Sequence, residues 1–521
     1  MQAKWDAIVV GSGIGGLTAA AALGRVGRRV LVLERHRQAG GLTQTFVRAG
    51  FRFNIGVHYL GGFGPGQPSR KLFEALIGDR LKMAPIEGAF DRVSFPGFRI
   101  ALDAAGSRGG GAALLEAFPQ ERAGLARYAE AVDQAQGALQ TLFLARCAPP
   151  LAASALTWFK HRAIERWVER TTQDVVAECV TSPQARAVLS ARWGDYGSPP
   201  SESSFALHAT VMNSYRDGAW YPVGGAGAFA REFGAAIRET GGEVRTDADV
   251  EAIEVEKGRT TGVRLADGTR IACDYVVSDI GIRNTLRRLP SPEVDYRWAR
   301  EGFSLDTSVG FVGLYLGLEG DITARGATAA NEWFYDSWDV NTLWRDPAGE
   351  ARAPALFVSF PSLRDPSHVP GPRSMHTCEM IALVDWSVFA QWDHSNAPDG
   401  MRLGTESAAR DESYRAFKAQ VEQQMLAQFG ERFPDLVPCV RVIESSTPIS
   451  VATYTGAEHG AMYGLQTTPR RFLAQALRPR TPVRGLYLAG QDAATPGVVG
   501  AAMGGFMAAA SAEPELWKLL R

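Results

Sequence analysis

The sequence lacks the features that mark a secreted, metal-binding or disulfide-stabilised protein. Its 521 residues include only five cysteines, and these are scattered without C-x-x-C spacing. A small, odd and dispersed set of cysteines indicates a reducing compartment and excludes both a disulfide framework and a zinc site of paired cysteines. No cluster of histidine and cysteine has metal-ligand spacing either, so we expect no metal.

Two further absences narrow the classes of partner. The formal net charge is −1 at pH 7, which leaves no basic surplus for nucleic-acid phosphates, so we expect no nucleic-acid partner. No run of eighteen apolar residues is present, so we expect no membrane-spanning helix. Because the first expected strand begins by residue 6, we also expect no signal peptide and a cytoplasmic protein.

What the sequence does contain is enough apolar material for more than one core. Hydrophobic residues make up 45% of the chain, which is typical of globular and not of disordered proteins. A chain of this length exceeds one ordinary core, so we expect two domains.

The first residues predict a βαβ unit. Residues 6–10 and 29–33 are short β-branched apolar runs, typical of buried parallel strands. Between them, the alanine- and leucine-rich stretch 17–26 predicts a helix that Gly27 ends. Strand, helix and strand in this order indicate a Rossmann-type fold.

The first turn of this unit has the sequence G-x-G-x-x-G. Gly11 permits the tight turn, Gly13 permits the backbone to approach a pyrophosphate, and Gly16 permits close helix–strand packing. The N–H groups at the helix start bind phosphate oxygens. The turn residues that we expect to bind a dinucleotide are Gly11, Gly13, Ile14, Gly15 and Gly16.

Glu34 is a second feature, after the glycine turn, that predicts a dinucleotide site. It follows at about the twenty-residue spacing expected for the acid that binds a ribose hydroxyl. An acid there disfavours a 2′-phosphate on the adenosine. The alternative, a strand–helix turn without a ligand, leaves Glu34 unexplained.

The next residues carry a family resemblance. E-x-x-x-x-x-G-G ends at Gly41, and F-N-x-G-x-H-Y follows over residues 53–59. Together with the Rossmann unit these motifs resemble the phytoene desaturase, carotenoid isomerase and retinol saturase group, which consists of flavoproteins with an amine-oxidase-like fold. That group more usually has Asp where this chain has Asn54.

The resemblance implies an α/β flavoprotein with two dinucleotide-binding domains, in which a Rossmann-type FAD domain joins a mixed α+β substrate domain. It also implies that Val250 lies over the adenosine. The paired glycines before Leu42 let the backbone lie close to a ligand. The FAD residues expected in these stretches are Arg35, Gly41, Leu42, Thr43 and Val250.

The C-terminal stretch favours FAD over NAD. An apolar strand at 485–489 ends in Gly490-Gln491-Asp492, and a helix follows from about 501 to 512. In flavoproteins with two dinucleotide-binding domains, such an acid binds the ribityl or pyrophosphate part of FAD, and the helix start stabilises charge at the flavin by about 0.3–1 kcal/mol. The alternative is a final strand and helix packed on the sheet, which leaves the acid unexplained. The FAD residues expected here are Gly490, Asp492, Gly497 and Val498.

We expect the FAD domain to be assembled from three parts, at 1–75, 222–300 and 446–521. The second part contains the strand candidates 250–255, 261–265 and 270–272 of a β-meander, followed by a strand at 275–279 that returns to the Rossmann sheet. Residues 76–221 are expected to be mainly helical, and residues 301–445 to form the substrate sheet, with strands at 302–318, 357–360 and 377–386.

Residues 142–167 combine apolar and aromatic side chains with a cluster of cations. Aromatic residues beside cations suit a membrane interface, although a core-packed helix with a solvated basic end has the same pattern. The resemblance favours peripheral contact with the inner face of a membrane, because enzymes of this group take their substrates from lipid.

Several aromatic residues are candidates for the substrate site. Most of Trp333, Phe334, Tyr335 and Trp392 are expected in the core, and some should line an apolar pocket for a hydrophobic ligand. Saturating a C=C bond needs a hydride from flavin and a proton from the protein. The candidate proton donors are His58, Tyr59, Tyr454 and His459, with His58 as the first choice. The alternative for a lone histidine such as His58 is a hydrogen-bonded structural residue, which is the more common case.

We therefore expect an FAD-dependent oxidoreductase that acts on a carbon–carbon bond of a hydrophobic polyene, isoprenoid or unsaturated acyl chain, as a saturase or a desaturase. The stretch G-Q-D-x-x-T-x-G-x-x-G-A from Gly490 is closer to the retinol saturase branch and favours saturation. Redox-neutral cis–trans isomerisation, an amine oxidase and a carrier without flavin are the alternatives. A single Rossmann unit predicts an external electron donor or acceptor in place of tightly bound NADPH.

Overall fold

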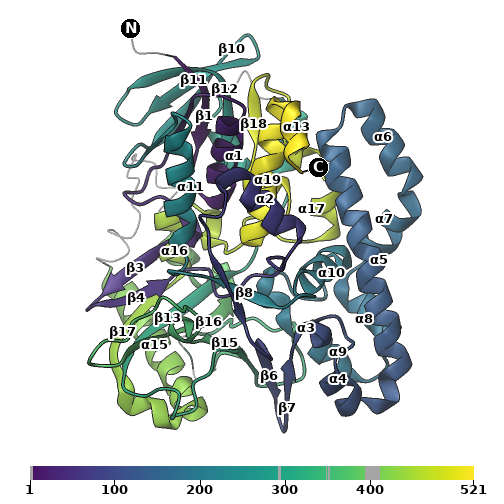
Figure 1. Cartoon of the computed structure of the whole chain (residues 1–521), viewed down its shortest axis with the longest axis vertical. Helices are drawn as coiled ribbons and strands as arrows, with labels where there is room; N and C mark the ends of the chain where they lie inside the picture. The colour runs from purple at the N-terminus through teal and green to yellow at the C-terminus, as the bar shows by residue number, and fades with distance from the viewer. Residues whose placement is uncertain (1–3, 291–294, 348, 350–351, 394–410, 521) are drawn as a thin grey trace.

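The computed structural model describes residues 4–290, 295–347, 349, 352–393 and 411–520. Two seven-stranded sheets organise these residues. In Figure 1 the first sheet occupies the upper part of the molecule and the second the lower part, with a column of helices along one edge.

The first sheet is the expected Rossmann sheet. β1 lies at its centre, between β2 and β12, and all three strands are parallel. Its parallel strands, from one edge to the other, are β9 (Glu243–Arg245), β2 (Val30–Leu33), β1 (Trp5–Val10), β12 (Arg270–Ser278) and β18 (Leu486–Leu488). Segments from the beginning, middle and end of the chain therefore share one sheet.

β12 also belongs to the meander. It pairs antiparallel with β11 (Arg259–Leu265), which pairs with β10 (Val250–Glu256). The sequence predicted separate strands at 270–272 and 275–279, and this division was wrong: one nine-residue strand runs through both segments. A single extended strand passes from the meander into the parallel sheet because no glycine or proline interrupts residues 270–278.

Small residues let two helices approach the same turn. α1 (Ile14–Arg25) packs against α19 (Gly497–Ala512) and α11 (Ala228–Glu239). A Cβ added to Gly505 of α19 would lie 1.9 Å from the carbonyl oxygen of Gly15. The two helix backbones are therefore in direct contact, which only glycine permits.

The second sheet is mixed, in the order β17-β13-β16-β15-β14-β6-β7. Its strands are β6 (Asp91–Phe95), β7 (Phe98–Leu102), β13 (Gly310–Glu319), β14 (Asn331–Tyr335), β15 (Ala355–Ser359), β16 (Met375–Val384) and β17 (Val440–Ser446). The hairpin β6–β7 lies inside the segment 76–221 that we expected to be mainly helical. Likewise, Gly302 and Phe303, expected in a strand, end the helix α13 (Tyr296–Phe303).

The column of helices at the edge of Figure 1 is built from α5 (Arg122–Cys147), α6 (Pro150–Phe159) and α7 (His161–Trp167). α5 packs along α10 (Phe205–Ser214). Among the helices that the structure describes, none is both long and apolar enough to cross a bilayer.

Shorter elements complete the fold. The helices are α2 (Pro68–Ile77), α3 (Ala104–Ser107), α4 (Ala112–Ala117), α8 (Thr172–Cys179), α9 (Pro183–Ser190), α12 (Ile282–Arg287), α15 (Glu412–Arg432), α16 (Pro448–Thr455), α17 (Pro469–Leu473) and α18 (Gly490–Ala493). Two small hairpins pair β3 (Thr45–Arg48) with β4 (Phe51–Asn54), and β5 (Met83–Ile86) with β8 (Ala219–Pro222).

Candidate active site

One cavity connects the first Rossmann turn with the second sheet. It encloses about 2230 Å³ of space, part of which is open to solvent. The predicted site residues that line it are Gly11, Gly13, Ile14, Gly15, Glu34, Arg35, Gly41, Leu42, Thr43, His58, Tyr59, Val250, Tyr454, Asp492, Gly497 and Val498. Gly16, Gly490 and His459 were also predicted and are not part of its wall.

The turn at the start of α1 has the conformation that its glycines predict. Gly11 has φ +94°, a backbone conformation that side chains disfavour. A Cβ on Gly16 would lie 2.2 Å from the carbonyl oxygen of Gly11, so this glycine acts through packing and not through ligand contact. No side chain caps α1, which leaves its first N–H groups for phosphate oxygens.

Glu34 is held rigidly at the end of β2. Its carboxylate accepts hydrogen bonds from the backbone N–H of Ser12 at 3.1 Å, from the Ser12 hydroxyl at 2.6 Å and from the backbone N–H of His36 at 2.8 Å. The residue is 8% exposed and lines the cavity. This position suits an acid that binds ribose hydroxyls.

Asp279 is a site residue that the sequence analysis did not single out. It follows β12 and lies against the glycine turn, where a Cβ on Gly13 would come within 2.7 Å of its Oδ2 and a Cβ on Gly490 within 2.1 Å of its Oδ1. Burial raises the pKa of Asp279 to about 8, and the negative charges of Glu34 and Asp492 add to this, while a hydrogen bond from the Gly16 amide opposes it. Its place directly after an apolar strand was the available signal.

Asp492 joins the C-terminal segment to the middle of the chain. Its Oδ2 accepts a hydrogen bond from the backbone N–H of Ile282 at 2.9 Å, and its Oδ1 accepts one from that of Leu465 at 3.4 Å. α19 begins at Gly497, which has φ +81°, has no side-chain cap and has open space where a Cβ would be.

The residues present fit FAD. Two helix starts without capping side chains, at Ile14 and Gly497, open onto one cavity that Glu34 and Asp492 also line. An extended dinucleotide with a pyrophosphate and two polyhydroxyl parts matches this set of groups. FAD, when bound, supplies hydride transfer.

His58 lies at the second-sheet end of the cavity, beyond the end of β4. Its Nδ1 is 3.1 Å from Oε2 of Glu379 on β16 and 3.4 Å from the Ser359 hydroxyl. Its Nε2 is buried and has no hydrogen-bond partner among the described residues. The imidazole also packs edge-on against Phe357, with ring centroids 4.9 Å apart.

Tyr59 belongs to a separate buried polar network. Its hydroxyl lies 2.9 Å from Oδ2 of Asp195 and 3.3 Å from Oδ2 of Asp91. Asp91 pairs with Arg192 at 3.1 Å and accepts the indole N–H of Trp333 at 3.0 Å. No local sequence pattern predicts this network, because its members lie on separate elements that only the fold brings together.

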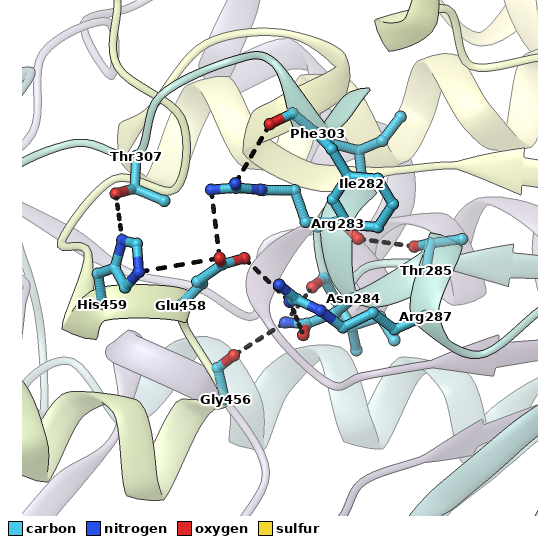
Figure 2. Close-up of polar contacts among 12 residues, drawn as sticks. Ile282, Arg283, Asn284, Thr285, Arg287, Phe303, Thr307, Gly456, Glu458 and His459 are labelled. Carbon is cyan, nitrogen blue, oxygen red and sulfur yellow. Dashed lines mark hydrogen bonds and ion pairs between the residues drawn. The ribbon is translucent and has the colours of Figure 1, made fainter. Parts of the chain in front are cut away.

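Tyr454 and His459 lie away from this end of the site. Tyr454 is 49% exposed and packs edge-on against His36, near Arg35. Figure 2 shows His459 bonded to the Thr307 hydroxyl, at 3.1 Å, and directed at Glu458, which pairs with Arg283 and Arg287. Because Arg283 and Glu458 both line the cavity, this cluster joins two of its walls.

Two of the four candidate aromatic residues line the cavity, a larger share than the minority expected. Trp333 and Tyr335 line the cavity, whereas Phe334 and Trp392 are buried in the core on the other side of the second sheet. The remaining large apolar residues of the substrate end of the wall are Trp193, Phe311, Leu356, Phe357, Ile381, Leu383 and Met462. This end of the cavity therefore suits a hydrophobic molecule.

The model of the family "Flavin containing amine oxidoreductase" matches residues 14–512. The chain belongs to this family. It is 30% identical to the all-trans-retinol 13,14-reductase of Danio rerio, over 96% of this chain and 84% of that protein. It is 25% identical to the chloroplastic prolycopene isomerase of Daucus carota, over 97% of this chain and 79% of that protein.

The expected fold class is confirmed by the solved structures of two amine oxidases. Putrescine oxidase bound to putrescine has a TM-score of 0.63 at 15% identity, with 98% of this chain and 99% of that chain covered. Cyclohexylamine oxidase from Brevibacterium oxydans IH-35A has a TM-score of 0.60 at 18% identity, with both chains covered in full. At these identities the likeness concerns the fold.

Membership of the flavin amine oxidoreductase family confirms the expected cofactor and class of protein. FAD is the cofactor, and the protein is an FAD-dependent oxidoreductase and not a carrier without flavin. Its relatives include enzymes named for the reduction and the isomerisation of polyenes, as the family resemblance implied.

Proposed function

We propose that this protein uses reduced FAD to saturate one C=C bond of a hydrophobic polyene. The observation that carries the proposal is the continuity of the FAD site with an apolar, aromatic-lined space in a single cavity. The retinol reductase relative is named for this reaction. Cis–trans isomerisation is the second candidate, because the prolycopene isomerase relative covers the chain to the same extent.

An anaerobic single-turnover experiment tests the proposal. The FAD-loaded enzyme is reduced with dithionite, mixed with all-trans-retinol, and followed in the flavin absorption band while the polyene is analysed by chromatography. Saturation predicts that the oxidised flavin band returns in step with loss of one C=C bond. A flavin that stays reduced while the polyene changes geometry would establish the isomerase and overturn saturation.

An amine oxidase would behave differently in the same protein. Putrescine or cyclohexylamine would reduce oxidised FAD, and air would then produce hydrogen peroxide. We expect neither, because the substrate end of the wall is apolar and aromatic over most of its residues. Rapid flavin reduction by an amine would therefore reject the polyene proposal.

We further propose that the electrons come from an external donor. The sequence has one G-x-G-x-x-G turn, and this turn opens onto the described cavity as the site of one dinucleotide. NADPH alone should therefore leave the FAD oxidised, whereas a small reduced flavoprotein or iron–sulfur protein should reduce it.

We also propose that α6 contacts a membrane surface. Leu151, Trp158 and Phe159 are 88%, 73% and 77% exposed, and the exposed cations Lys160 and Arg162 follow them directly. Figure 1 places α6 at the outer edge of the molecule. An apolar helix exposed in this way indicates an interaction surface. Aromatic side chains beside cations suit the lipid headgroup region.

A further inference from the structure

Asp195 is an acidic residue of the cavity wall that contacts a buried phenol shared with a second acid. It ends the short 3-10 helix Ala191–Asp195, lines the same cavity as His58, and is partly accessible from it. Its carboxyl group contacts the Tyr59 hydroxyl through both oxygens, at 2.9 and 3.1 Å. Tyr59 also reaches Asp91, at 3.3 Å, so one phenol lies between two carboxyl groups.

The charges around these groups do not balance if both acids are ionised. Asp91 is completely buried, and its partners are Arg192, Trp333 and Asn331, each at 3.0 to 3.1 Å. Arg192 therefore compensates Asp91. Two carboxylates joined through one phenol would leave a net negative charge in a buried site, which low-dielectric surroundings strongly disfavour.

Apart from Arg192, which pairs with Asp91 and whose charge also acts on Asp195, the groups of the described residues that face Asp195 supply no positive charge. They are phenols that stay neutral, because burial raises the pKa of each: Tyr59, Tyr196, Tyr215, Tyr335 and Tyr463. Asp195 is therefore the acid that keeps a proton. Burial and the charge of Asp91 raise the pKa of Asp195 to about 7, against the opposing effects of Arg192 and the Tyr59 hydrogen bond.

We propose that Asp195 is the proton donor of the reduction, with Tyr59 as the residue that positions it and links it to Asp91. This inference depends on the saturation proposed above. One carbon of the C=C bond takes a hydride from reduced FAD, and its neighbour takes the proton from the Asp195 carboxyl group. The π bond is replaced by two C–H bonds, FAD is oxidised by two electrons, and Asp195 is left as a carboxylate. Two electrons from the external donor and two protons from water restore the starting state, with one proton taken up by FAD on its reduction and the other by the Asp195 carboxylate.

His58 is the alternative donor, because it lies on the same wall. Its Nδ1 is directed at Glu379, and its Nε2 has no partner among the described residues. Asp195 differs from it in being buried beside a second acid, which favours the protonated form, and in contacting a phenol that holds the carboxyl group in place. The experiment therefore compares the two residues directly.

Infrared difference spectroscopy tests the protonation state without any turnover. The FAD-loaded protein is titrated from pH 5 to pH 9, and the carbonyl stretch of a protonated carboxylic acid is followed. We expect a component of this band to disappear with a midpoint near pH 7 and to be missing in Asp195→Asn, whereas the component from Asp279, with a midpoint near pH 8, should remain. In Tyr59→Phe the midpoint should move to higher pH, because a hydrogen bond that favours the carboxylate is lost. A spectrum unchanged by Asp195→Asn would overturn the proposal.

Single-turnover reoxidation of the reduced enzyme by retinol tests the donor role. Asp195→Asn should slow the reaction by at least about 100-fold, the lower range for loss of a general acid, and Asp195→Glu should recover part of it. The wild-type rate should fall as the pH rises through about 7. Equal FAD content and equal melting temperature in the variants separate this effect from misfolding.

Three results would reject the assignment. Asp195→Asn could react at the wild-type rate, or the dependence on pH near 7 could survive in Asp195→Asn and vanish in His58→Gln, which would make His58 the donor. The third result is that no added polyene reoxidises the reduced flavin of the wild-type enzyme, although the infrared titration gives the expected midpoint. In that case the proposed saturation fails, and the donor role of Asp195 fails with it.

Discussion

The side-chain amide of Asn54 donates a hydrogen bond of 3.0 Å to Oε1 of Glu379, and the backbone N–H of Asn54 donates to the same oxygen at 2.7 Å. The other oxygen of Glu379 faces His58 at 3.1 Å. The side-chain oxygen Oδ1 of Asn54 accepts a hydrogen bond from the backbone N–H of Ala226, and the side-chain Nδ2 also donates to the Tyr221 hydroxyl. An amide at position 54 therefore matches a carboxylate at 379.

This contact predicts that Asn54→Asp is destabilising. The new carboxylate would face Glu379 at hydrogen-bond distance and would lose both amide donors, so we expect a loss of about 1–3 kcal/mol in the free energy of unfolding. The loss should be greater at pH 8 than at pH 5, where protonation of one carboxyl group relieves the repulsion. Urea denaturation at both pH values measures it, and equal losses would contradict the explanation.

Glu34→Gln should weaken FAD binding. The amide would have to turn a donor toward Ser12 or His36, whose groups now donate to the carboxylate, and the charged acceptor for ribose is lost. Hydrogen bonds to charged groups contribute about 1.5–3 kcal/mol, so we expect the dissociation constant of FAD to rise by roughly 10-fold to 100-fold. Fluorescence titration of the deflavinated protein measures it. Glu239→Gln, which removes an exposed partner of Arg80, should leave the constant unchanged.

Gly505→Ala should disrupt the FAD domain. The added methyl group would lie 1.9 Å from the Gly15 carbonyl oxygen, so α1 and α19 would have to separate beneath the phosphate-binding turn. We expect a loss of several kcal/mol in stability and a lower FAD content. Gly137→Ala is the matched control, because Gly137 lies within a helix with open space around its Cβ position. That variant should be neutral or stabilised by up to about 1 kcal/mol. Similar melting temperatures in the two variants would be inconsistent with close packing of α1 on α19.

Asp279 predicts how stability depends on pH. Its pKa in the folded protein, about 8, is above the ordinary value of 3.8, so the folded state binds more protons than the unfolded state between these values. Stability should therefore fall as the pH rises from about 4 to about 8, by up to about 1.4 kcal/mol per pH unit from this group. Asp279→Asn should flatten this part of the profile in thermal unfolding from pH 5 to pH 9. A profile that keeps its slope in the variant would assign the dependence to other groups.

The exposed apolar surface of α6 predicts lipid binding. The double variant Trp158→Ser, Phe159→Ser should reduce co-flotation with vesicles that contain anionic lipid, by about 10-fold or more, because two large aromatic side chains leave the interface. Folding and single-turnover chemistry with detergent-solubilised retinol should remain as in the wild type. The wild-type protein could instead fail to bind vesicles and form a dimer that the double variant does not form. In that case a second copy of the chain covers α6, and the membrane proposal is wrong.

The sequence by itself determined the dinucleotide end of the site. The glycine turn, Glu34 and the paired glycines before Leu42 act through local backbone conformation and through spacing along one βαβ unit, so consecutive residues carry the information. The same holds for the strand and helix around Asp492, whose glycines and acid follow one another directly. The family resemblance extended these local patterns to FAD and to the fold class.

Only the tertiary structure decided the polar groups of the substrate end. His58 meets Glu379, and Tyr59 meets Asp195 and Asp91, across distances of 32 to 321 residues in the chain. No local periodicity encodes such pairs, because they depend on which strand neighbours which in the second sheet and on where a short 3-10 helix touches it. The charge on Asp195 is likewise a property of its buried neighbours, since desolvation and the nearby Asp91 exist only once the chain has folded.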